Sequence, residues 1–505
     1  MSDHNVGTRN GINHDSESDD GDKPQKESQK KSVMGTSVDG AKALYYGEGL
    51  GPMVRASTIP LRSLAYKYGA DFAYTEELID RSLSSTQRVV NTALGTIDYI
   101  KFDPHNHTRI TTTRRKVSKG HDSLLILRID PTLERHRLVC QIGTGNAQHA
   151  LQAALHVHQD VAAIDVNMGC PKKFSIGGGM GSALLQDPDR ASEIIRALSN
   201  AISTSYIGSI DTGSCETGGD GTDNAVMATL NHPNHSKGQP KPVSAKIRLL
   251  PTIQGTIDFI TALVNAGVQA IAIHGRHVGN PDVENAYWDE LYTVTTIATK
   301  KFPHVQFLIN GDFYTRYEFN KFMQCTGVEG VLLARPALHN TSIFIKPPAQ
   351  TDSKTTTTTV HDTSSSEDGT TPLTSQSVLY GYNSPLLLDK ATVIQEYLQE
   401  AIRYDGHYKN VKYVICEMMN LRRAPHARVP YLNQHRPNNP VAMTNMPTIG
   451  TTCAQNSIEE LCQIWNVNYN EHIRNSRHRA SLLSALPDER TYSDSYHLEQ
   501  QAQQP

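Results

Sequence analysis

The stretch V-A-A-I-D-V-N-M-G-C-P-K-K-F-S-I-G-G-G-M-G, residues 161–181, joins an apolar run to a glycine-rich loop. Residues 161–166 are apolar or β-branched apart from one aspartate, which is typical of a strand buried on both faces. Asn167 and Cys170 follow directly, before the glycines. Such strands lie in parallel sheets covered by helices, and in barrels of this kind their carboxyl ends carry the functional side chains. The stretch therefore predicts both a fold class and the position of a site.

The same alternation of short apolar runs and helical patterns extends over much of the chain. Helical patterns cover residues 146–158, 189–200 and 257–266. The runs expected to form strands are residues 51–54, 71–74, 138–142, 161–166, 243–247, 268–273, 305–309 and 328–333. Eight buried strands separated by helices predict an α/β fold, a (β/α)₈ TIM barrel. A six-stranded doubly wound sheet is the alternative. The number of runs and the lack of a phosphate-binding fingerprint after the first strand disfavour it.

Composition divides the rest of the chain. Residues 97–130 interrupt the alternation with two apolar segments around a basic loop, which predicts an inserted hairpin. Helical periodicity after the barrel predicts a small all-helical C-terminal domain. The expected boundaries are a disordered N-terminal tail at 1–40, the catalytic barrel at 41–346 with a disordered insertion at 204–239, a low-complexity linker at 347–377, the helical domain at 378–466 and a flexible tail at 467–505.

Charge and cysteine content bound the function class. The formal net charge is −3, so a nucleic acid would need a local basic face. The sequence has no long uninterrupted apolar run, and its N-terminus is acidic and polar, so we expect neither a membrane span nor a secretory signal. The seven cysteines are scattered and none lies in C-x-x-C. We therefore expect a protein of the cytoplasm or nucleus, where thiols stay reduced.

Polar or ionisable side chains follow nearly every expected strand. Since a TIM barrel has its active site at the carboxyl ends of its strands, these side chains are expected to share one rim. The residues at these positions, most of them polar or ionisable, are Pro52, Met53, Thr75, Glu76, Glu77, Gln141, Asn167, Cys170, Lys246, Arg248, His274, Arg276, Asn310, Gly311, Asp312, Ala334 and Arg335. Each alone could be a local cap or ion pair, but their coincidence favours a site.

Charge suggests roles for some of these residues. The loops after the seventh and eighth strands commonly bind phosphate, and Arg335 offers a guanidinium there. Lys246 suits a ligand that develops negative charge, as a reduced flavin does. Gln141, Asn167 and His274 can donate to or accept from a flavin edge. Because no G-x-G-x-x-G fingerprint occurs, FMN fits better than a tightly held dinucleotide.

Cys170 differs from an ordinary buried cysteine by its position. It lies just after a strand and before a proline, on the expected rim. A metal role needs further ligands at suitable spacing, and the other six thiols stand apart in the sequence, so no metal site is expected. A cysteine with an ordinary pKa is mostly a thiol at pH 7, and it could therefore act as an acid.

Together these motifs resemble the tRNA-dihydrouridine synthases. The motifs are D-V-N-M-G-C-P-K with G-G-M-G, G-P-M-V, E-E-L-I-D, C-Q-I-G-T, K-I-R-L-L-P-T, H-G-R, N-G-D and L-L-A-R. The resemblance covers about residues 44–346, and H-Y-K-N-V-K-Y-V-I-C-E-M-M extends it to the family's helical RNA-binding domain in 390–465. The pattern is most similar to the eukaryotic branch that acts on position 20 of the D-loop.

The resemblance implies an FMN enzyme that takes electrons from NADPH and reduces the C5–C6 double bond of a uridine in tRNA. Flavin N5 would deliver hydride to C6, and Cys170 would supply the proton to C5. The resemblance implies FMN contacts for Pro52, Met53, Gln141, Lys246, His274, Asn310, Gly311, Asp312, Ala334 and Arg335. Substrate contacts are expected for Asn167, Lys172, Arg248 and Arg276. We expect no obligate protein partner.

Two basic clusters are candidates for phosphate contacts on tRNA, although a solvated surface is the simpler reading of any one residue. They are Arg109, Arg114, Arg115, Lys116 and Lys119 in the insertion, and Arg403, Lys409, Lys412, Arg422, Arg423 and Arg428 in the helical domain. Two other functions stay open at this point. One is an FMN barrel that reduces a small pyrimidine or enone, and the other is a tRNA-binding factor that has lost catalysis.

Overall fold

The computed structural model describes residues 37–101, 125–203, 240–280, 284–346, 387–420 and 446–475. The expected disordered insertion at 204–239 and linker at 347–377 lie outside these ranges, as does nearly all of the expected tail at 1–40. So do several candidate RNA contacts, namely Arg109, Arg114, Arg115, Lys116, Lys119, Arg422, Arg423 and Arg428.

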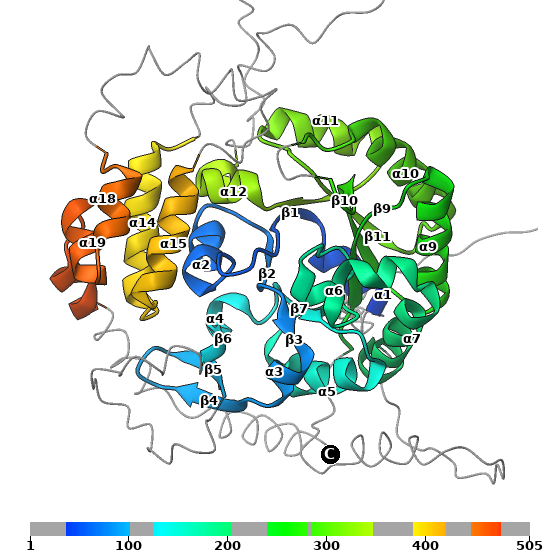
Figure 1. Cartoon of the computed structure of the whole chain (residues 1–505), viewed down its shortest axis with the longest axis horizontal. Coiled ribbons are helices and arrows are strands. Elements are labelled where there is room, and N and C mark those ends of the chain that lie inside the picture. Colours follow the sequence, from blue (N-terminus) through cyan, green and yellow to red (C-terminus); the bar gives the residue numbers. More distant parts are fainter. Residues whose placement is uncertain are drawn as a thin grey trace, which may run out of the picture. The chain divides into compact units, whose positions relative to one another are not determined.

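Eight parallel strands close into a barrel (Figure 1). They are β1 Gly47–Leu50, β2 Phe72–Tyr74, β7 Leu138–Gly143, β8 Ala163–Asn167, β9 Val243–Leu249, β10 Ala270–His277, β11 Gln306–Asn310 and β12 Gly330–Leu333. The order is β2-β1-β12-β11-β10-β9-β8-β7, and pairing of β2 with β7 closes the ring. A short β3, Leu78–Ile79, also pairs with β7. The predicted (β/α)₈ TIM barrel is confirmed.

The first strand lies earlier than predicted. It covers Gly47–Leu50, and the expected run at 51–54 forms the turn that follows it. The sequence G-E-G-L has little β propensity. Gly49 is nevertheless needed, because a Cβ there would lie 2.1 Å from the ring of Phe72 on the neighbouring strand. The position of the first strand therefore depends on the close approach of two barrel strands, which the local sequence does not indicate.

Helices cover the outside of the barrel (Figure 1). They are α2 Ile59–Lys67, α3 Asp80–Ser84, α4 Pro131–Glu134, α5 Ala147–Val157, α7 Pro188–Leu198, α9 Ile253–Asn265, α10 Trp288–Lys301, α11 Arg316–Thr326 and α12 Arg335–His339. A short helix, α6 Lys173–Gly177, lies in the loop after β8. The expected helices at 146–158, 189–200 and 257–266 are confirmed as α5, α7 and α9. A further helix, α1 Ser37–Leu44, begins inside the expected N-terminal tail. Inside the ring, Tyr45, Phe72 and Tyr74 fill the core together with small residues such as Ala272.

The insertion between β2 and β7 is a three-stranded antiparallel sheet. Its strands are β4 Gln87–Asn91, β5 Thr96–Ile100 and β6 Leu125–Ile129. The expected hairpin at 97–130 has the right place but lacks β4. That strand has few apolar residues, and Val90 is 62% exposed, so an edge strand of this kind gives a weak sequence signal.

The C-terminal helices pack beside the barrel. They are α14 Lys390–Arg403, α15 Tyr408–Met419, α18 Ile449–Ala454 and α19 Ile458–Ile464. Helix α14 contacts α2, and α15 contacts α12 (Figure 1). Helical residues also occur at 469–475, beyond the expected end of this domain. None of the helices in the described ranges has the length and apolar character needed to cross a membrane.

Candidate functional site

Strand register brings the predicted rim residues together. Asn167 at the end of β8 pairs with Lys246 on β9. His274 on β10 pairs with Arg248 on one side and with Asn310 on the other. Because these strands are parallel neighbours, five of the predicted site residues lie on four adjacent strands at one end of the barrel.

The loop that carries Cys170 is anchored by its neighbours. The side-chain oxygen of Asn167 accepts hydrogen bonds from the backbone N–H of Gly169 at 3.0 Å and of Cys170 at 3.2 Å. The Nε of Arg248 donates to the carbonyl of Gly169 at 2.7 Å, and its Nη1 donates to the carbonyl of His277 at 3.1 Å. Arg248 therefore holds the cysteine loop in place. Its predicted contact with substrate stays a prediction.

The environment of Cys170 keeps its thiol protonated. Burial raises the pKa of Cys170, and the negative charge of Glu77 raises it further. Burial also raises the pKa of the Glu77 carboxyl group, which accepts a hydrogen bond from Ser175 Oγ at 3.3 Å. The Cys170 side chain is still partly exposed at the rim. A neutral thiol that a ligand can reach is suited to donate a proton.

Lys246 is a cation in unfavourable surroundings. Burial, and next the positive charge of Arg248, lower the pKa of Lys246 to about 8, although Asp165 and Cys170 act in the opposite direction. Within the described ranges, no hydrogen bond or ion pair links the Lys246 ammonium to a protein acceptor. An ammonium so placed favours a ligand that carries or develops negative charge at this position.

A buried polar network lies beneath the rim, inside the barrel. Asp165 accepts hydrogen bonds from Gln141 Nε2 at 2.8 Å and from Ser244 Oγ at 2.6 Å, and Ser244 in turn accepts one from the hydroxyl of Tyr45 at 2.8 Å. Burial raises the pKa of Asp165 to about 6. The amide nitrogen of Gln141 is thus used by Asp165, and its amide oxygen remains for a ligand. Sequence reasoning missed Asp165, although an aspartate inside a buried run was a visible signal.

His274 is neutral and its tautomer follows from its neighbour. Burial, and next the positive charge of Lys246, lower the pKa of His274 well below its ordinary value. Nη1 of Arg276 lies 3.0 Å from His274 Nε2. Because a guanidinium only donates, Nε2 must accept, and the ring proton is on Nδ1. His274 is therefore a hydrogen-bond donor through Nδ1.

Asp312 organises the two arginines on this side of the rim. It has a positive φ of 58° directly after Gly311, and its carboxylate accepts from Arg335 Nη2 at 2.5 Å, from Arg276 and from the backbone N–H of Ala286 at 2.9 Å. Arg276 is only 1% exposed and also donates to the carbonyl of Glu284. This geometry favours a positioning role for Asp312 and Arg276, whereas the Arg335 side chain is 25% exposed. Their predicted ligand contacts stay predictions.

The first and last βα loops meet beside this group. The N–H of Gly51 donates to the carbonyl of Leu333 at 3.0 Å. A Cβ on Gly51 would lie 3.2 Å from the Cβ of Ala334. Pro52 and Met53 follow and are partly exposed.

Two predicted residues frame the site. Asn310 donates through Nδ2 to the carbonyl of Leu332 at 2.8 Å, which joins β11 to β12. Lys172 is exposed and precedes α6, beyond Cys170. In the described part of the chain, His, Cys, Asp and Glu side chains form no group of three that could hold a metal ion.

Glu77 was grouped with the rim residues because it follows β2, but it was given no role, and its effect on Cys170 is seen only in the structure. Ser244 was not predicted as a site residue. Ser244 lies inside β9 and only tertiary contacts show its place in the network.

Comparison with known proteins places the chain in a family. The chain is 29% identical over 374 residues to "tRNA-dihydrouridine(20) synthase [NAD(P)+]" of Schizosaccharomyces pombe, covering 73% of this chain and 59% of that protein. It is also 29% identical to the protein of the same name from Saccharomyces cerevisiae, covering 73% of this chain and 76% of that protein. Among solved structures, ligand-free DHODH from Eimeria tenella is similar with 14% identity and a TM-score of 0.35, over 60% of this chain and 83% of that one. The family model described as "Dihydrouridine synthase (Dus)" matches residues 49–208 and 232–412, so this chain belongs to the dihydrouridine synthase family.

Proposed function

We propose that the protein is an FMN- and NADPH-dependent tRNA-dihydrouridine synthase that reduces the C5–C6 double bond of the D-loop uridine at position 20. Family membership and the names of the two yeast relatives support this. The observation that carries the proposal is the neighbouring placement of the partly exposed Cys170 thiol, in the loop after β8, and the Lys246 ammonium on β9.

The residues of the rim fit FMN. The Lys246 ammonium, without a protein acceptor in the described part of the chain, and the Nδ1 donor of neutral His274 suit the electron-rich pyrimidine end of a flavin. The remaining oxygen of Gln141 suits a ring N–H. Arg335, held by Asp312, suits the phosphate. When bound, the flavin supplies the hydride for uracil C6.

Cys170 would complete the reduction by donating its thiol proton to uracil C5. Burial and Glu77 hold the pKa of Cys170 above its ordinary value, so the thiol is protonated at neutral pH and does not need a base to become active. Hydride and proton together add two hydrogens across the double bond, and a thiolate is left. The backbone N–H of Lys172 favours this thiolate, and solvent can return the proton because the side chain is partly exposed.

The substrate base must leave its stack to reach a thiol at the mouth of a barrel. Exposed Lys172 and Lys173 lie just beyond Cys170 and are suited to approach the tRNA backbone. Lys409 of α15 is also exposed, whereas Lys412 donates to the carbonyls of Cys453 and Gln455 and so caps α18. We place the protein in the cytoplasm or nucleus, where its substrate class occurs.

The decisive experiment compares the wild type with Cys170→Ala on tRNA from cells that lack this activity. Purified wild type should be yellow and should form dihydrouridine at position 20 with NADPH. Cys170→Ala should keep its flavin and lose activity by on the order of a hundredfold or more. An equally active variant would contradict the role of Cys170. Turnover of free uracil at rates like those on tRNA would instead favour a small-molecule reductase, and a colourless wild type would favour a binding factor.

A further inference from the structure

The loop after β1, residues 51–58, carries Pro52 and Met53, which the proposed function places against the flavin. It is held from two sides. Within the loop, Ser57 Oγ donates to the carbonyl of Gly51 at 2.9 Å and accepts from the N–H of Met53 at 3.0 Å, and on the barrel side the loop contacts Glu76. The other side contacts the helical domain, and the contact is made at Arg55.

Arg55 has an unusual backbone conformation for a residue with a side chain. Its φ is +67°, in the left-handed region that favours glycine. Such a residue persists where its surroundings determine the conformation on both sides. Here the N–H of Arg55 donates to Glu76 Oε2 at 2.7 Å, and its carbonyl accepts from Asn410 Nδ2 at 2.9 Å. One of these two hydrogen bonds thus comes from the barrel and the other from α15.

The side chain of Arg55 also contacts α15. Its guanidinium lies 4.2 Å from the ring centroid of Tyr413. Asn410 and Tyr413 are three residues apart on α15, so they present one face of that helix to the loop.

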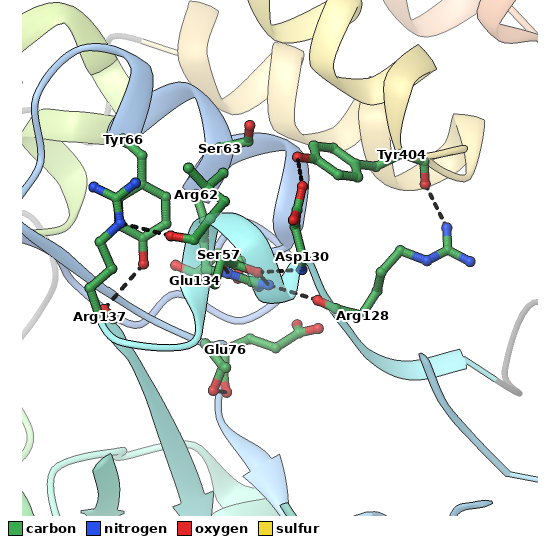
Figure 2. Close-up of polar contacts among 12 residues, drawn as sticks. Ser57, Arg62, Ser63, Tyr66, Glu76, Arg128, Asp130, Glu134, Arg137 and Tyr404 are labelled. Atoms are coloured by element: carbon green, nitrogen blue, oxygen red, sulfur yellow. Dashed lines mark hydrogen bonds and ion pairs between the residues drawn. The ribbon is translucent and has the colours of Figure 1, made fainter. Parts of the chain in front are cut away.

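A second, buried connection runs from the same loop to α14 (Figure 2). Arg62 donates through Nη1 to the carbonyl of Ser57 at 2.8 Å and through Nη2 to the carbonyl of Arg128 at 2.8 Å. Its Nε forms an ion pair with Glu134 Oε1 at 2.6 Å. Arg128 in turn donates through Nη1 to the carbonyl of Tyr404 at 2.5 Å. The loop is therefore part of a continuous set of contacts between barrel and helical domain.

We propose that the helical domain positions the flavin loop, with Asn410 and Tyr413 as positioning residues that raise flavin affinity. The inference rests on the proposed function, since it assigns FMN to this rim. The loop conformation at Arg55 is unfavourable by itself, so a contact that holds it in the free protein removes an ordering cost from flavin binding. Loss of that contact lets residues 51–58 relax and separates Pro52 and Met53 from their binding positions.

The test titrates FMN into the flavin-depleted full-length protein and measures the dissociation constant from the change in flavin fluorescence on binding. Asn410→Ala should weaken FMN binding on the order of threefold to tenfold, the effect of one hydrogen bond. Its melting temperature should stay near that of the wild type, since the contact is exposed. Glu417→Gln, a conservative change seven positions further along the same helix, is the matched control and should bind FMN like the wild type.

A double-mutant cycle gives the second measurement. Arg55→Ala and Tyr413→Leu should each weaken FMN binding, and the double variant should be no weaker than the more affected single variant, because both remove one contact. Unchanged FMN affinity in Asn410→Ala, or fully additive effects in the cycle, would overturn the inference. A wild type that does not bind FMN at all would instead refute the proposed function, so the two failures are distinguishable.

Discussion

Replacing Lys246 by methionine should stabilise the flavin-free protein while removing its function. Burial and Arg248 lower the pKa of Lys246 from its ordinary 10.5 to about 8. At about 1.4 kcal/mol for each tenfold change in acidity, this corresponds to about 3 kcal/mol of unfavourable free energy at neutral pH. Water screens part of this cost because the side chain is partly exposed, and the lost attraction to Asp165 offsets more. We expect a net gain of about 1–2 kcal/mol.

The stability difference should depend on pH. A lysine whose folded pKa lies below its unfolded pKa destabilises the fold fully below the folded value, near pH 8, and the penalty fades as the pH rises toward 10.5. The stability difference between Lys246→Met and the wild type should therefore be largest at pH 7 and shrink by pH 10.

The assay is chemical unfolding of flavin-free protein at these two pH values, with FMN affinity and dihydrouridine formation measured in parallel. Lys300→Met on α10 is the control, because Lys300 is an exposed lysine away from the rim and its loss should change little. A Lys246→Met protein that is less stable than the wild type at pH 7, or a difference that does not depend on pH, would refute the reasoning. So would unchanged FMN affinity, since the ammonium is proposed to act on the flavin.

Three other outcomes follow from particular contacts. Asp312→Asn should lower stability by about 3 kcal/mol or more and weaken FMN binding in a titration, because two guanidinium groups lose their carboxylate; a fully stable variant would contradict this. Tyr404→Phe should cost about 1–2 kcal/mol in unfolding experiments, since its buried hydroxyl donates to Asp130 at 2.8 Å, and an unchanged unfolding midpoint would show that the hydroxyl is dispensable. Oxidised glutathione should convert Cys416 and Cys453, whose sulfurs lie 3.2 Å apart, into one disulfide and leave reduced glutathione. Peptide mass mapping would show the cross-link, and its absence in the oxidised wild type would argue against the contact.

The site was predictable where chain position decides it. In a parallel barrel every strand ends on the same rim, so Asn167, Cys170, Lys246 and His274 could be grouped before any contact was known. The charge states of these side chains could not be predicted, because they depend on burial in the folded protein. Burial, and next Arg248 on the same strand, lower the pKa of Lys246, and burial, and next Lys246 on the neighbouring strand, lower the pKa of His274.

Predictions failed where long-range packing overrides the local pattern. The first strand was placed at 51–54 because that run looks apolar, whereas the strand is a glycine-containing segment that fits against Phe72. The cysteines are scattered in the sequence, yet Cys416 and Cys453 meet across α15 and α18. Spacing along the chain carries no record of such contacts.

The sequence by itself determined the alternation of strands and helices, the family resemblance and the residues of the rim, because apolar periodicity and chain order are local properties. Tertiary structure alone decided how those residues are used. Asp312 serves two arginines, and Arg55 is held between Glu76 and a helix more than 350 positions away. The physical reason is that hydrogen bonds and burial depend on distance in space, which becomes defined only when the barrel closes and the helical domain packs against it.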